Sequence, residues 1–81
     1  MDNFKKGDRI KILDQGLEID KATVVKISNN PLVVNVKGDC YPNIINEFRF
    51  IDQFNSWYLA FKGLDEKSCF NKRFPYSLCL V

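Results

Sequence analysis

Polar and apolar residues alternate with a period of two along most of this chain. The pattern begins at residues 9–13, directly after a turn signal at Lys6-Gly7-Asp8, and continues through two segments rich in β-branched side chains. Such side chains are stiff at χ1 and pack well on a pleated sheet, and this alternation is typical of half-buried strands. The sequence predicts a mostly β domain of about five to six strands, near residues 9–13, 22–28, 32–37, 44–51, 57–62 and 76–81.

The segments between these strands predict turns and at most one short helix. Asp14-Gln15-Gly16 interrupts the alternation, and residues 17–21 either alternate again or form an irregular loop. Asn29-Asn30-Pro31 is a short turn, which makes the strands on either side of it a hairpin. Residues 65–73 have room for one or two helical turns, which Phe74-Pro75 would stop.

Alternation also assigns the inward-facing side chains. In the strand at 32–37, Leu32, Val34 and Val36 share the core face, and in the strand at 44–51 two Phe residues share one face. In the strand at 57–62 one of the two faces must be core. The residues predicted to form the core are Ile12, Val25, Val34, Phe48 and Phe50.

Residues 6–51 resemble the small SH3-like β-barrel superfamily, which includes Tudor-like and KOW-like modules. The resemblance rests on the strand that follows Gly7-Asp8, on the segment Ala22-Thr23-Val24-Val25-Lys26-Ile27, and on the hairpin that ends at Gly38. It implies a single open barrel, with residues 52–81 adding an aromatic strand and a C-terminal extension made of a short helix, an extra strand or both. For KOW-like modules it also implies nucleic-acid binding.

Length, charge and cysteine content narrow the class of protein. The 81 residues make one domain, residues 1–81. The net charge of +2 is shared evenly, with seven Lys/Arg and six Asp/Glu in residues 1–40 and five and four in residues 41–81. This balance excludes an acidic DNA mimic and is unlike a dedicated DNA-binding domain. The chain has three Cys, no apolar leader and no long apolar run. These features predict a reduced cytoplasmic protein with no membrane association.

The residue types that catalysis and metal binding need are missing or badly spaced. The chain has no His, the commonest general base near neutral pH, and the spacing of Cys40, Cys69 and Cys79 fits no zinc site. Lys and Arg neighbours could activate Cys69, but a buried apolar thiol is the simpler interpretation. Asp14, Glu18 and Asp20 are interpreted as a solvated acidic loop. We therefore expect a protein that is not an enzyme and holds no cofactor.

Binding is the remaining class of function, and two interpretations stay open. Exposed aromatic residues deliver much of the energy of protein interfaces, and cations beside them steer an acidic partner. The first hypothesis is a small protein-interaction module, such as a phage- or mobile-element-encoded regulator or inhibitor of a larger complex, with self-association through an uncovered edge or the strand at 76–81 as its simplest form. Its contact residues are Tyr41, Phe54, Trp57, Tyr58, Lys67, Lys72 and Arg73.

The alternative is an RNA- or DNA-binding module of the SH3-like or KOW-like kind. Lys and Arg supply the phosphate contacts of such proteins, so their affinity falls steeply with salt. The phosphate contacts expected in this case are Lys5, Lys6, Arg9, Lys11, Lys72 and Arg73.

We expect the purified protein to carry no stoichiometric metal, because it lacks His and has unsuitable Cys spacing. Elemental analysis of the protein after gel filtration measures this directly. About one equivalent of zinc or iron per chain would contradict the expectation.

Overall fold

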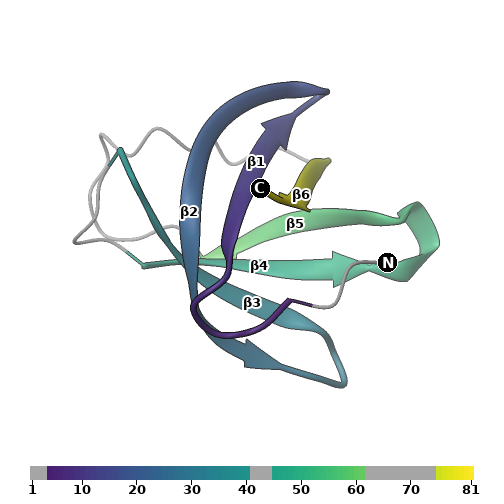
Figure 1. Cartoon of the computed structure of the whole chain (residues 1–81). Coiled ribbons are helices and arrows are strands. Elements are labelled where there is room, and N and C mark those ends of the chain that lie inside the picture. Colours follow the sequence, from purple (N-terminus) through teal and green to yellow (C-terminus); the bar gives the residue numbers. More distant parts are fainter. Residues whose placement is uncertain (1–3, 41–44, 62–74) are drawn as a thin grey trace.

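The computed structural model describes residues 4–40, 45–61 and 75–81. Its strands form an antiparallel meander in which each strand pairs with the next, and the last returns to the first to close a barrel (Figure 1). A short 3-10 turn, η1, covers Asp52–Phe54. The six strands are β1 (Arg9–Asp14), β2 (Leu17–Ser28), β3 (Val33–Gly38), β4 (Ile45–Ile51), β5 (Ser56–Phe61) and β6 (Tyr76–Leu80).

A two-residue turn joins β1 to β2. Asp14 pairs with Leu17 across this turn, and the residues between them, Gln15 and Gly16, have φ values of 53° and 84°. Positive φ at both central positions defines the type I′ turn, which matches the twist of the flanking strands and favours Gly. The chain therefore continues directly into β2, and residues 17–21 form a strand and not the irregular loop.

β2 is the longest strand, and each of its halves pairs with a different neighbouring strand. Residues 17–23 pair with β1, and residues 22–28 pair with β3. The register between β1 and β2 shifts between Ile12 and Leu13. The register between β2 and β3 shifts between Val24 and Lys26. Each shift is a β-bulge, which bends the strand and increases its twist, and Figure 1 shows β2 curving around the barrel.

The barrel interior is filled by apolar side chains from all strands. Phe48 and Tyr76 are fully buried, with their ring centres 5.4 Å apart in an edge-to-face arrangement. Aromatic pairs favour that geometry over a face-to-face sandwich. The buried apolar residues are Ile10, Ile12, Ala22, Val24, Val34, Val36, Phe48, Trp57, Leu59, Tyr76 and Leu78.

β6 closes the barrel between β1 and β5. All five of its residues pair with β1, and among the described residues Tyr76 also pairs with Trp57 of β5. The resemblance implied an open barrel, and the structure differs because β6 occupies the gap between the first strand and β5. The strand proposed for self-association is thus paired within its own chain on the β1 side.

The strand predictions are confirmed to within a residue or so, except that β2 begins earlier than expected. Ile12, Val34 and Phe48 are fully buried as predicted, and Phe50 is half-buried against the core. The prediction that Val25 is a core residue is wrong: Val24 is 1% exposed, and Val25 is only half-buried. The helix expected at 65–73 lies outside the described residues.

The burial of Val24 and Val25 can be compared directly by substitution. Val24→Ala removes two methyl groups from the core and should lower the free energy of unfolding by about 2–3 kcal/mol. Val25→Ala loses the same atoms and the same β-branching at the bulge, and should cost about 1 kcal/mol or less. Chemical denaturation of both variants measures the difference, and equal or reversed costs would contradict the register of β2.

Candidate functional site

Exposed aromatic side chains gather on the hairpin formed by β4, η1 and β5. Phe54 at the end of η1 is 58% exposed, and Tyr58 on β5 is 49% exposed. Asn55 between them adopts a left-handed conformation with φ 49°, and the Ser56 hydroxyl donates a 3.0 Å hydrogen bond to the Phe54 carbonyl. This tight turn holds the backbone of Phe54 directly before β5.

Trp57 has a different place from its two aromatic neighbours. It is 4% exposed and points into the barrel, where its ring centre lies 5.1 Å from that of Phe50 and 5.9 Å from that of Phe4. Alternation along β5 therefore sends Trp57 inward and Tyr58 outward. Trp57 therefore offers almost no surface of its own to a partner.

The sheet register adds Arg49, which the sequence analysis did not select. Arg49 is exposed and pairs with Tyr58 on one side and with Val33 on the other. Directly opposed side chains in an antiparallel sheet have Cβ atoms roughly 4.5–5.5 Å apart. We call Arg49, Phe54 and Tyr58 the hairpin surface. The outward position of Arg49 follows from strand alternation, but its pairing with Tyr58 depends on the register that the turn at η1 sets between β4 and β5.

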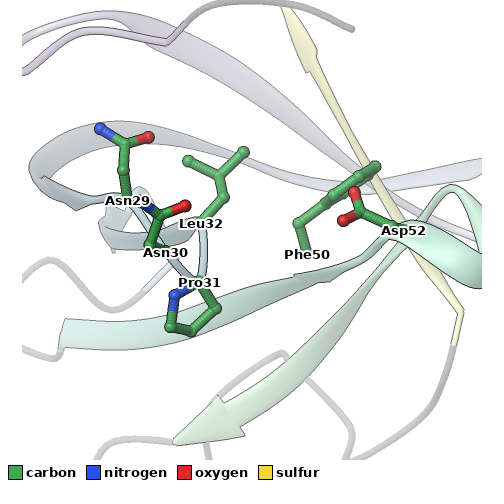
Figure 2. Close-up of a pocket in the computed structure, with 6 residues that line it drawn as sticks. All are labelled: Asn29, Asn30, Pro31, Leu32, Phe50 and Asp52. Carbon is green, nitrogen blue, oxygen red and sulfur yellow. The ribbon is translucent and has the colours of Figure 1, made fainter.

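A pocket of about 270 Å³ opens at the same end of the barrel. Figure 2 shows the turn between β2 and β3 on one side of it, and Phe50 and Asp52 on the other. The Phe50 amide donates a 3.0 Å hydrogen bond to the Leu32 carbonyl, which ties the two sides together. Leu32 and Phe50 provide apolar surface, while polar groups come from Asp52, Asn29 and Asn30.

The basic segment of the first hypothesis is not part of the described structure. Tyr41, Lys67, Lys72 and Arg73 lie outside the described residues, as does Cys69. Of the seven residues predicted to contact a protein partner, the structure places Phe54 and Tyr58 exposed on the same hairpin and Trp57 in the core.

Arg9 is held in a side-chain network on the outside of the barrel. Its guanidinium donates to both carboxylate oxygens of Asp39, at 2.9 and 2.6 Å, and to the Thr23 hydroxyl at 2.9 Å. The hydrogen bonds from Arg9 lower the pKa of Asp39, and those same bonds raise the pKa of Arg9. This bidentate geometry orients Arg9 and offsets part of its charge.

Of the other predicted phosphate contacts, Lys5, Lys6 and Lys11 belong to the described residues, whereas Lys72 and Arg73 lie outside them. Lys11 is half-buried on β1, two residues further along the same strand. Lys5 and Lys6 are exposed in the segment before β1. The Lys5 amide donates a 2.8 Å hydrogen bond to the Asp8 carboxylate, and this bond shapes the turn that leads into the strand.

The three acidic residues interpreted as a solvated loop, Asp14, Glu18 and Asp20, lie on strands β1 and β2. Asp14 and Asp20 are each 8% exposed, and only Glu18 faces water. The Glu18 Oε2 lies 3.4 Å from the Lys21 Nζ. The Asp20 carboxylate accepts hydrogen bonds from the backbone amides of Lys21 and Cys40, at 2.8 and 3.5 Å. The loop prediction is wrong because the type I′ turn extends β2 back to Leu17, which makes Asp20 part of a strand.

The described residues provide little for metal or thiol chemistry. Among them, no group of three or more His, Cys, Asp or Glu is placed to hold a metal ion. Cys40 is an exposed free thiol, and Cys79 is a half-buried one. No helix in the described part of the chain has the length and apolar character to cross a membrane.

The Arg9–Asp39 contact predicts a pH dependence. Arg9→Gln should raise the pKa of Asp39 toward the ordinary aspartate value of 3.8, because it removes the hydrogen bonds that lower it. Lys21→Gln, which removes only a weaker charge interaction, should have a smaller effect. NMR titration of the Asp39 carboxyl carbon measures both shifts.

The sign of the stability effect follows from the direction of that shift. A lowered folded-state pKa stabilises the protein above pH 3.8, and this contribution disappears as the pH falls through the folded-state value. The stability difference between the wild type and Asp39→Asn should therefore shrink below pH 3.8. The prediction fails if the Asp39 titration is the same in the wild type and Arg9→Gln.

Comparison with known proteins assigns this chain to no family. The chain matches no family model, no curated protein and no solved structure. The small six-stranded antiparallel barrel is compatible with an SH3-like fold, and nothing in the comparisons points to the Tudor-like or KOW-like branches.

Proposed function

We propose that this chain is a small non-catalytic protein-interaction module that docks through its hairpin surface. The observation that carries the proposal is the exposure of Phe54 and Tyr58 on one hairpin. The large aromatic side chains of Phe48, Trp57 and Tyr76 are buried in the same barrel. Tyr and Arg are among the residue types that most often dominate binding energy at protein interfaces, and Phe is enriched there.

The rigidity of the hairpin favours tight docking. Tyr58 lies in a regular ladder with β4, and its sequence neighbour Trp57 is fixed by contacts with Phe4 and Phe50. A backbone that is already ordered loses little entropy when it binds. The pocket beside Phe50 and Asp52 would receive a small side chain of the partner close to Phe54.

A regulator or inhibitor of a larger cytoplasmic complex, of the kind that phages and mobile elements encode, is the form of this proposal that suits so small a domain. Lys67, Lys72 and Arg73 would then provide charge complementarity to an acidic partner. A second copy of the chain is the simplest partner.

The test compares Tyr58→Ala and Phe54→Ala with Leu17→Ala. Leu17 is also a large exposed apolar residue, 73% exposed, but it lies beside the β1–β2 turn. A partner is first captured from a lysate of the source cell and purified, and its affinity for each variant is then measured by calorimetry. Tyr58→Ala and Phe54→Ala should each weaken binding by about 1 kcal/mol or more, and Leu17→Ala should leave it unchanged.

Light scattering on the pure protein tests the version in which the partner is a second copy. Self-association that Tyr58→Ala abolishes and Leu17→Ala preserves would support docking through the hairpin surface. A strict monomer that captures no protein, or a partner bound equally by all variants, would overturn the proposal.

A further inference from the structure

The fold gathers most described cations on one side of the barrel. In sequence the two halves of the chain carry the same net charge. In the structure, all described Lys and Arg residues except Arg49 lie on β1, β2 or β3, or in the segment just before β1. Five carboxylates lie on or beside the same strands as these seven cations, whereas β4 and η1 contribute two carboxylates, Glu47 and Asp52, against one described cation, Arg49. The five are Asp8, Asp14, Glu18, Asp20 and Asp39. Cations therefore outnumber carboxylates on the side of the barrel formed by β1, β2 and β3, but not on β4 and η1.

The strand register arranges these cations in rows on the outer surface. Arg9 pairs with Thr23, which pairs in turn with Lys37. In the next row Lys11 pairs with Lys21. Their sequence neighbours Ile10, Ile12, Ala22 and Val36 are buried, so alternation directs the cationic side chains outward.

The bulge in β2 adds a third row. Lys26 is exposed and pairs with Asn35, and the extra residue Val25 lets Ile27 turn inward beyond it. Neighbouring strands are about 4.8 Å apart, and rows on one face are about 7 Å apart along a strand. Arg9, Lys11, Lys21, Lys26 and Lys37, which we call the basic face, thus form a dense array.

The charge of this array is only partly offset. Asp39 pairs with Arg9, and Glu18 pairs with Lys21. Lys11, Lys26 and Lys37 form no ion pair with any described residue. Lys11 and Lys21 are directly opposed like charges, an arrangement that destabilises a sheet, and of the two only Lys21 has a carboxylate partner among the described residues.

The N-terminal segment extends the same charge. The Gly7 amide donates a 2.7 Å hydrogen bond to the Val24 carbonyl, and the Val24 amide donates a 2.9 Å bond to the Asp8 carbonyl. These bonds hold the segment beside β2, close to the bulge that carries Lys26. The exposed Lys5 and Lys6 immediately precede the anchored residues.

We propose that the basic face binds the phosphate backbone of a nucleic-acid duplex, without regard to sequence. Lys is depleted from protein interfaces, whereas phosphate contacts come from Lys, Arg, Thr and Asn side chains, which is the composition of this face with Thr23 and Asn35. Binding of single strands relies on aromatic stacking platforms. The exposed aromatic residues among those described, Phe54 and Tyr58, lie on η1 and β5, and β5 is opposite β2 in the ring of strands.

This proposal does not depend on the protein-interaction function, because the two surfaces share no residue. Binding is measured by fluorescence anisotropy with labelled duplexes of mixed sequence, one of DNA and one of RNA, at salt concentrations from about 50 to 200 mM. The variants are Lys11→Gln, Lys37→Gln and, as a control matched in charge, Arg49→Gln on β4. Circular dichroism and thermal unfolding confirm that each variant is folded.

The wild type should bind at least one of the duplexes, and its affinity should fall steeply with salt. Lys11→Gln and Lys37→Gln should each weaken binding severalfold at low salt and reduce the slope of log affinity against log salt by about one unit. Arg49→Gln should change neither quantity. Comparison of the DNA and RNA duplexes identifies which backbone is preferred.

Three results would overturn the proposal. The first is no binding to either duplex at the lowest salt concentration. The second is an equal loss of affinity in Arg49→Gln, which would mean that overall charge and not this face is responsible. The third is tighter binding to polyglutamate or to a single strand than to both duplexes. None of these results bears on Tyr58→Ala, so the two proposals fail separately.

Discussion

A six-stranded sheet closes into a barrel only if it curves through a full circle, and the bend of β2 makes this curvature possible. One strand pairs with β1 through its first half and with β3 through its second. Its two bulges supply the curvature that a regular strand lacks. They also decide which side chains point inward on either side of each bend. The core at Ala22 and Val24 and the exposure of Lys26 both depend on this one strand.

Strand alternation was strong enough to predict most of the fold from the sequence. The β-branched and aromatic segments gave strand positions that the structure reproduces, because each strand has one buried face and one wet face. Bulges are harder to foresee, since a single extra residue reverses the alternation beyond it without any compositional signal. Val25 was misassigned for this reason. Asp20 was misassigned because Gln15 and Gly16 make a tighter turn than the interruption of the pattern suggested.

The candidate surfaces were predictable only in part. Tyr58 was expected on an exposed face if Trp57 and Phe61 are core, and that expectation for Tyr58 and Trp57 agrees with the structure. Arg49 was missed because its proximity to Tyr58 depends on the pairing of β4 with β5. The basic face was hidden by an even charge balance along the chain. β1, β2 and β3 are consecutive, and two of their three carboxylates, Asp14 and Asp20, turn inward while their lysines turn outward.

The position of Trp57 gives the protein an internal optical label. It is the only tryptophan in the chain, it is almost completely buried, and it pairs with Tyr76 across the junction of β5 with β6. Its indole therefore sits where the last strand joins the rest of the barrel wall. Emission from this ring reports on that junction, so separation of β5 from β6 would expose the indole to water and change its fluorescence.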